Sequence, residues 1–327
     1  MIIFRFRQCA RVLIFCLILP AFSYTASYAA DRREARTLSH YILATMYSDL
    51  GEIDEAIREY KKALINDPQN YLIRLNLATT YIRKNELEKG TEELNAAVKL
   101  NPDAVEPHAI LALIYTSTNK PDLATHEYEV ALKNASKLAP KNVDIYKTLG
   151  AVYLQQKKFK EAESAYRMVL DLSPEDAQAY FYLANTSDEL NDKKKAEEYL
   201  KKSLDLKPDY HEALNYLGYL YVEEGKNLET AQGLIKKALE MQPDNGAYLD
   251  SLGWLYFKQG KFKEALKELD RASFLLEDPV IYEHLGETYL KMGDKENTRI
   301  YWEKSLKLDP GQPKLKKKLE ELKWATK

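Results

Sequence analysis

The feature that most constrains the fold of this chain is internal repetition. From residue 37 onward, the sequence divides into repeats of about 34 residues that align with one another. Each repeat has a leucine, a small residue and usually a tyrosine, then a second small residue, an aromatic or leucine, a third small residue and usually a proline. In the first repeat these are Leu43, Ala44, Tyr47, Ala56, Tyr60, Ala63 and Pro68. The spacing predicts two helices joined by a turn in every repeat.

Eight such repeats account for nearly all of the chain after a short lead-in over 31–36. We expect the repeats to span 37–70, 71–104, 105–142, 143–176, 177–210, 211–245, 246–278 and 279–312, followed by a capping helix over 313–327. A single helix pair is too small to fold alone, so stacking of the pairs must supply one continuous core.

Two repeats depart from the regular length. The third carries four extra residues around "NASKLAP", which predicts one additional turn in its second helix. The sixth has one extra residue in the turn "EEGKNLETA". Both insertions are consistent with tolerated drift or with a ridge that contacts a partner.

The end of the chain places three leucines on one stripe of a helix that is otherwise rich in lysine. Leu315, Leu319 and Leu322 form the stripe, which predicts a polar cap at the open end of the repeat array. A membrane-surface role for the lysines is the alternative.

This pattern resembles the tetratricopeptide repeat family. The resemblance implies an all-α fold, a right-handed superhelix (α-solenoid) of antiparallel helix pairs, A and B, whose A helices line a concave groove. It also gives a reason for Gly253, a poor helix former within a predicted A helix. At this position helix A would cross helix B closely, opposite Ala265, so that no side chain larger than methyl fits.

Residues 1–30 are typical of an export signal. Three arginines precede an apolar run over 12–22, and "SYTASYAAD" then offers small residues for cleavage near Ala29 or Ala30. The apolar run is short for a bilayer span. We expect an exported, periplasmic or envelope-associated protein with no transmembrane span after cleavage, and an uncleaved N-terminal anchor is the alternative.

Composition narrows the classes of function. Cleavage would remove both cysteines and three arginines, which leaves 45 basic against 50 acidic residues and a net charge of about −5. This balance does not favour nucleic acid as a partner. The sequence contains no phosphate-binding glycine loop, metalloprotease motif or nucleophile elbow, and the repeats leave no second domain for an active site. We therefore expect no catalytic residue, no cofactor and no metal.

The family resemblance also implies which side chains face the groove. In the fifth to seventh repeats it gives an aromatic run with amides beside it, which suits an extended peptide whose backbone the amides can bind. The candidate partner-binding residues are Phe181, Asn185, Asn215, Tyr219, Asp250, Trp254 and Phe257. The alternative is that a tight superhelix turns these rings against neighbouring A helices.

The C-terminal half is similar to a group of exported or lipid-anchored bacterial tetratricopeptide repeat proteins, through the runs "DSLGW" and "HLGE". This similarity implies a bacterial envelope scaffold but no settled biochemical role. We expect a non-enzymatic scaffold or adaptor of the cell envelope that binds a protein partner. One alternative is a substrate-recruiting subunit of an envelope transferase or of polysaccharide or peptidoglycan machinery. Another is direct binding of glycan strands along the aromatic groove.

Overall fold

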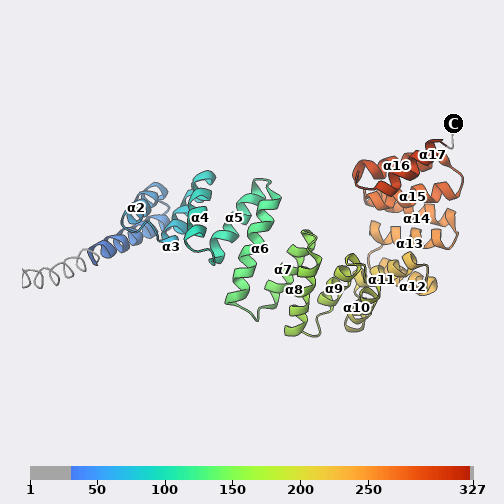
Figure 1. The fold of residues 1–327 in the computed structure, drawn as a ribbon, viewed down its shortest axis with the longest axis horizontal. Helices are drawn as coiled ribbons and strands as arrows, with labels where there is room; N and C mark the ends of the chain where they lie inside the picture. The colour runs from blue at the N-terminus through green and yellow to red at the C-terminus, as the bar shows by residue number, and fades with distance from the viewer. Residues whose placement is uncertain (1–30, 325–327) are drawn as a thin grey trace, which may run out of the picture. The chain divides into compact units, whose positions relative to one another are not determined.

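The computed structural model describes residues 31–324, and every regular element among them is an α-helix. Figure 1 shows the helices following one another as hairpin-like pairs, which confirms the predicted fold class. The A helices are one over 31–49, α3 (Tyr71–Arg83), α5 (Val105–Ser117), α7 (Val143–Gln155), α9 (Ala177–Glu189), α11 (His211–Glu224), α13 (Gly246–Lys258) and α15 (Pro279–Lys291). The B helices are α2 (Ile53–Asn66), α4 (Leu87–Leu100), α6 (Pro121–Leu138), α8 (Phe159–Leu172), α10 (Lys193–Leu206), α12 (Leu228–Met241), α14 (Phe262–Leu275) and α16 (Lys295–Leu308), and α17 (Pro313–Trp324) follows them.

The chain divides into two compact modules between Ile145 and Tyr146. In the C-terminal module, from α9 onward, each A helix packs on its own B helix, and that B helix packs on the next helix. The A helices α11, α13 and α15 also contact one another in chain order. This neighbour-to-neighbour packing builds the core of the module as a row rather than a sphere.

Gly253 lies where α13 and α14 approach most closely. A methyl group at this position would lie 2.7 Å from Leu269 Cγ and 3.2 Å from the carbonyl oxygen of Ala265, and both of these residues are fully buried. The next pair repeats the arrangement, because a methyl group at Gly286 would collide with the ring of Trp302. The close crossing predicted at Gly253 is confirmed, but it is tighter than predicted, because the Leu269 side chain leaves no room even for a methyl group.

Asparagine or aspartate caps several A helices just after the proline that ends the preceding repeat. Asp176 accepts a hydrogen bond from the backbone N–H of Ala179 at 2.9 Å, and Asn245 accepts one from Tyr248 at 3.2 Å. These bonds satisfy backbone donors that have no partner within the helix. Gly246 follows Asn245 and is buried. A methyl group at Gly246 would lie 2.7 Å from Leu276 Cβ, so the backbone is tightly packed there.

The turn from helix A to helix B uses a left-handed residue at the same position of each predicted repeat. Gly260 and Gly293 have φ values of +75° and +83°, a conformation that glycine adopts without strain. Asparagines hold the position in three other repeats, whereas the fourth repeat has Lys157 there with φ +56°. A lysine in this conformation is strained.

The two insertions lie where the sequence predicted them. Helix α6 has 18 residues, whereas α4 and α8 have 14 each, so the four extra residues add one turn to this helix. The single extra residue of the sixth repeat lies in the turn after α11, where Gly225 and Asn227 both have positive φ.

Helix α17 covers the last helix pair of the C-terminal module. Leu315, Leu319 and Leu322 are buried in one cluster with Trp302, which is 1% exposed. The leucine stripe is therefore the inner face of a cap, as the sequence predicted.

The predicted export signal over 1–30 lies outside the described residues. From residue 31 to residue 324, no helix combines the length and the apolar character that a membrane crossing needs.

Candidate partner-binding site

A cavity of about 410 Å³ opens along the A helices of the C-terminal module. We call it the A-helix cavity. It lies beside the first three turns of α11, the first two turns of α13 and the start of α15, with one ring from α9. It is lined by Phe181, Glu212, Asn215, Tyr216, Tyr219, Ala247, Tyr248, Asp250, Ser251, Leu276, Asp278, Val280 and Ile281. Four of the seven predicted partner-binding residues are in this lining, namely Phe181, Asn215, Tyr219 and Asp250.

The cavity walls combine aromatic rings with acceptor oxygens. The Phe181 ring lies 6.1 Å from the Tyr216 ring, and the Tyr216 hydroxyl donates a hydrogen bond to Asp188 Oδ2 at 2.8 Å. Burial, and then this bond, raises the pKa of the Tyr216 phenol. Asn215 Oδ1 is buried and accepts no hydrogen bond from any described residue. A buried acceptor without a donor is costly, so a donor that reached this atom after a turn of the Asn215 side chain would stabilise the site.

Three carboxylates belong to the same lining. Glu212 lies in the first turn of α11, Asp250 lies further along α13, and Asp278 caps α15 by accepting the backbone N–H of Val280 at 2.7 Å. Burial, followed by the charges of Glu223 and Asp250, raises the pKa of the Tyr219 phenol. The cavity lining therefore combines aromatic rings with negatively charged carboxylates.

Trp254 does not line the A-helix cavity among the described residues. Its ring is 9% exposed and stacks on Phe257 at 4.3 Å and on His284 at 3.9 Å. Its Nε1 donates a hydrogen bond to Glu223 Oε1 at 2.5 Å. The sequence left open whether this ring faces a partner or packs between A helices, and the geometry is that of packing. A direct role of Trp254 in binding stays a prediction.

His284 and Asp250 join α15 to α13. Asp250 Oδ1 lies 2.9 Å from His284 Nδ1, and both side chains are buried. Because His284 also stacks on Trp254, one polar pair and one ring pair fix the spacing of these two A helices. Asp250 therefore has two roles: it lines the A-helix cavity, and its bond to His284 holds the neighbouring helix α15.

The remaining predicted residues lie outside the cavity lining. Asn185 is half-buried on α9, and Phe257 is half-buried at the end of α13, where its ring lies 5.7 Å from that of Phe262. Sequence reasoning missed Asp278 because it considered positions along each A helix and not the cap that precedes α15. It missed Val280, the second residue of α15, because its candidates came from the fifth to seventh repeats alone. The aspartate directly before Pro279 was the available signal.

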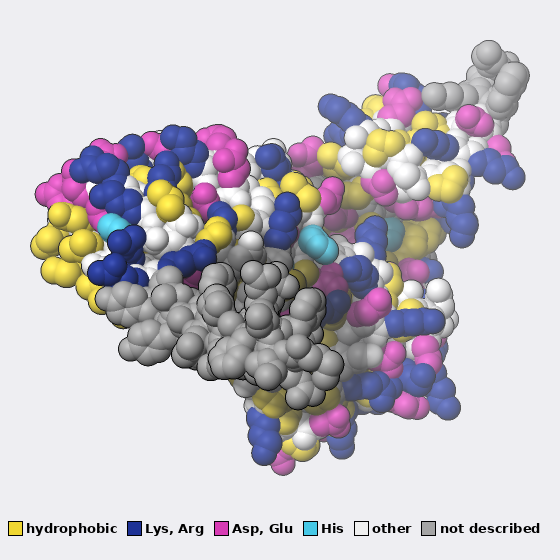
Figure 2. Space-filling view, turned by 60° about the vertical axis from the view of Figure 1, so that its left-hand side comes forward, with side chains coloured by type: hydrophobic (Ala, Val, Ile, Leu, Met, Phe, Trp, Pro, Cys, Tyr) yellow, Lys and Arg dark blue, Asp and Glu magenta, His cyan; other side chains and the backbone are white. Residues whose placement is uncertain are grey.

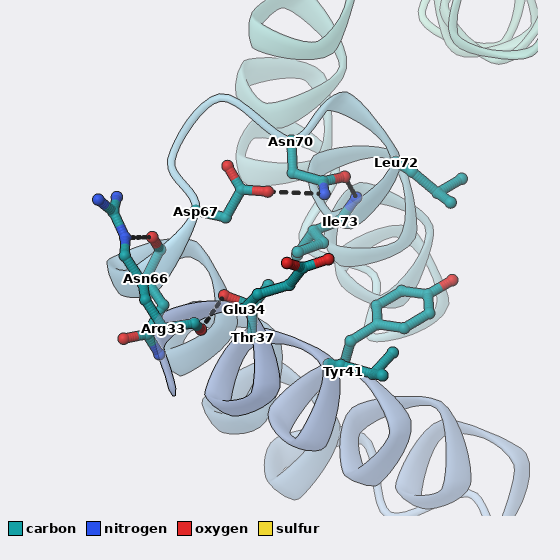
Figure 3. Close-up of a pocket in the computed structure, with 10 residues that line it drawn as sticks. Arg33, Glu34, Thr37, Tyr41, Asn66, Asp67, Asn70, Leu72 and Ile73 are labelled. Carbon is teal, nitrogen blue, oxygen red and sulfur yellow. Dashed lines mark hydrogen bonds between the residues drawn. The ribbon is translucent and has the colours of Figure 1, made fainter. Parts of the chain in front are cut away.

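A second cavity, of about 810 Å³, lies in the N-terminal module (Figure 3). The helix over 31–49 provides Tyr41 and Arg33, and the start of α3 provides Leu72. Much of its polar rim is already paired: Arg33 Nε donates to the Asn66 carbonyl oxygen, and the Asn70 amide donates to Asp67 at 2.9 Å. None of the seven predicted partner-binding residues lies in it.

The described residues show no grouping of three or more histidine, cysteine, aspartate or glutamate side chains suited to a metal ion. On the face shown in Figure 2, basic and acidic side chains are intermixed.

The fold is shared with solved structures of low sequence identity. A tetratricopeptide repeat protein from Parabacteroides merdae ATCC 43184 is similar with a TM-score of 0.60 and 19% identity, over 77% of this chain and 98% of that one. The structure of the APC/C hetero-tetramer Cut9-Hcn1 is similar with a TM-score of 0.57 and 19% identity, over 83% of this chain and 52% of that one. Yeast Tom70 gives a TM-score of 0.50 and 20% identity, over 91% and 64%. Identities this low establish a common fold alone.

No curated protein sequence matches the chain. Family models do match it. The model described as Cilia and flagella-associated protein 70 C-terminal domain matches residues 22–248, and the Tetratricopeptide repeat model matches residues 280–312. The first match extends over more than half of the chain. The chain therefore belongs to the tetratricopeptide repeat family represented by the Cilia and flagella-associated protein 70 C-terminal domain.

Proposed function

We propose that this protein is a non-enzymatic scaffold or adaptor of the bacterial cell envelope, which holds an extended segment of a partner protein in the A-helix cavity. Tetratricopeptide repeat proteins are generally non-enzymatic scaffolds. The observation that supports this site most directly is the convergence of Phe181, Asn215, Tyr219 and Asp250 on one cavity.

The form of the cavity suits a segment of chain better than a small molecule. Its lining comes from four successive A helices, so a ligand must extend along the row of helices to contact all of them. Leu276 and Val280 are 39% and 44% exposed in this lining, which leaves apolar surface for side chains of the partner. Rigid aromatic side chains in well-packed pockets are common anchors of protein interfaces.

The envelope setting has a separate basis. It rests on the pattern of residues 1–30 and on the similarity of the C-terminal half to exported or lipid-anchored proteins. Cell fractionation followed by N-terminal sequencing tests it. A mature chain that begins near Ala30 in the periplasmic fraction is expected, and an uncut chain in the cytosol would contradict the envelope setting.

Filling the cavity tests the proposed site. Ala247 is exposed in the lining at the start of α13, so an Ala247→Trp substitution places an indole in the cavity without disturbing the core. We expect this variant to capture much less partner from envelope extract than the wild type does. Ser164→Trp, at an exposed position of α8 outside the lining, is the matched control and should capture partner normally.

If Ala247→Trp and the wild type capture equal amounts of partner, the partner binds at a surface other than the A-helix cavity. Partner capture together with a transferase or a polysaccharide enzyme would favour the substrate-recruiting alternative. Binding of purified oligosaccharides in the absence of any protein, blocked by Ala247→Trp, would favour the glycan alternative.

A further inference from the structure

The A-helix cavity has a charge of one sign. Glu212, Asp250 and Asp278 are in its lining, and no lysine or arginine is among the described residues that line it. His211 Nδ1 lies 3.1 Å from Glu212, and His284 Nδ1 lies 2.9 Å from Asp250. Even with both imidazoles protonated, one of the three carboxylates remains without a compensating charge. The cavity is therefore anionic at every protonation state of its histidines in the neutral range.

One acceptor atom of a lining residue, Asn215 Oδ1, has no hydrogen-bond donor among the described residues. This atom is buried, and it can receive an N–H from a ligand once the Asn215 side chain, which lines the cavity, turns toward that ligand. Lysine and arginine side chains carry donors only, whereas a carboxylate would bring a further acceptor to this atom. The acceptor and the carboxylates therefore favour the same class of ligand.

The aromatic lining favours a cation as well. Phe181, Tyr216, Tyr219 and Tyr248 belong to the lining, and a cation close to the face of such a ring is attracted by the ring quadrupole. The exposed side chains of Leu276 and Val280 suit the aliphatic stem that a lysine or arginine buries beneath its charge.

The N-terminal ends of the helices at the site favour an anion rather than a cation. The N-terminal ends of α11, α13 and α15 carry partial positive charge, which attracts anions. Glu212 and Asp278 lie in the first turn or at the cap, where they offset this charge. Asp250 lies further along α13, beyond the first turn, so its charge is not taken up in this way.

We infer that the A-helix cavity selects an extended partner segment by a basic side chain, arginine or lysine, held between Asp250, Asp278 and Glu212 on the aromatic lining. This inference rests on the proposed function and narrows it to one chemical class of partner.

Three labelled peptides test the inference against the full chain. They share one apolar sequence and differ at a single central residue, which is arginine, norleucine or glutamate. We expect the arginine peptide to bind about tenfold or more tightly than the norleucine peptide, because a charge-assisted hydrogen bond is worth that factor. The glutamate peptide should bind most weakly. A tightest complex with norleucine or glutamate, or no binding by any of the three, would overturn the inference.

A pair of charge reversals locates the effect. Glu212→Lys changes an exposed carboxylate in the first turn of α11, within the cavity lining. Glu229→Lys makes the same change in the first turn of α12, outside that lining, and is the matched control. We expect Glu212→Lys alone to weaken the arginine peptide about tenfold.

The same variant separates this inference from the proposed function. If Ala247→Trp abolishes capture of partner from envelope extract while Glu212→Lys captures it fully, the scaffold function stands and selection of a basic side chain is rejected. If neither substitution affects capture, the A-helix cavity is not the binding site and both proposals fail.

Discussion

At the scale of single residues, two helical glycines of the C-terminal module, Gly253 and Gly233, have opposite roles. Gly253 lies against Leu269 in a crossing without room for a methyl group, whereas Gly233, within α12, has no neighbouring atom within 4 Å of the position of an added Cβ. The helix propensity of the two positions is the same, and only the space differs.

Alanine at each glycine should therefore change stability in opposite directions. Gly253→Ala is expected to lower the free energy of unfolding by about 1–3 kcal/mol, because the buried Leu269 side chain must shift. Gly233→Ala is expected to raise it by about 0.5–1 kcal/mol through helix propensity alone. Urea unfolding followed by circular dichroism measures both, and stabilisation by Gly253→Ala would contradict the crossing.

The strained lysine gives a second prediction at this scale. Lys157 is exposed and has φ +56°, in the turn position where other repeats have glycine or asparagine. Lys157→Gly should raise the free energy of unfolding by about 1 kcal/mol, since glycine removes the left-handed strain. Glu161→Gly, at an exposed position inside α8, should instead lower it. If both glycines destabilise the protein, the turn is not left-handed at Lys157.

Trp254 provides a third prediction. Its ring is packed between Phe257 and His284, so Trp254→Ala should destabilise the fold by about 3–5 kcal/mol. A urea midpoint close to that of the wild type, together with loss of partner binding, would show instead that the ring faces the partner. The measurement therefore decides between the two orientations that the sequence allowed.

The residue scale also shows where sequence reasoning stopped. The small residue at the A–B crossing recurs in every repeat, so its position could be predicted from the pattern. The environment of Trp254 could not, because its partners Glu223 and His284 come from the preceding and following A helices. Their distance depends on the angle between successive repeats, which a single repeat does not encode.

At the scale of helices, a cluster of charged groups joins α10 to the end of α11. Glu197 accepts hydrogen bonds from the Tyr221 hydroxyl at 3.0 Å and from Lys226 at 3.0 Å, and Lys201 lies 2.7 Å away. Lys201, then Lys226 and Tyr221, lowers the pKa of the Glu197 carboxyl to about 2, against the desolvation that raises it.

This lowered pKa predicts an acid-sensitive contribution to stability. Because the folded-state pKa lies below the ordinary value of 4.5, the unfolded chain takes up the proton first on acidification. The stabilisation is thus fully present above about pH 4.5 and is lost as the pH falls towards 2. Urea midpoints of the wild type and Glu197→Gln should differ at neutral pH and converge in acid, whereas the exposed neighbour Glu198→Gln should show no such trend. A difference that does not change with pH would contradict this role.

Helix lengths were the most predictable part of the fold. The four extra residues of the third repeat had to lengthen a helix or a loop, and they lengthen α6 because "NASKLAP" continues its helical spacing up to the proline. The cavity at the start of α15 was less predictable, since Asp278 and Val280 meet α11 only after the repeats stack.

At the scale of the whole molecule, the fold is a sequence of neighbour contacts. Such an array transmits a local loss of stability to adjacent repeats and little further. Hydrogen exchange resolved along the chain should show that Gly253→Ala reduces protection most in α13 and α14, less in α11, α12, α15 and α16, and not in α3 to α5. Uniform loss of protection would mean that the protein unfolds as one cooperative body.

The cap of α13 affects the rate at which Asn245 deamidates. An asparagine followed by glycine is the pair most prone to lose ammonia through a cyclic imide, which forms when the glycine nitrogen attacks the asparagine side chain. In the folded chain the Asn245 side chain is bonded to the Tyr248 N–H, and Gly246 is packed against Leu276. Ring closure must break the cap and draw Gly246 out of its packing, so deamidation at Asn245 proceeds only while the start of α13 is open. The rate of deamidation at Asn245 therefore reports how often the start of α13 opens.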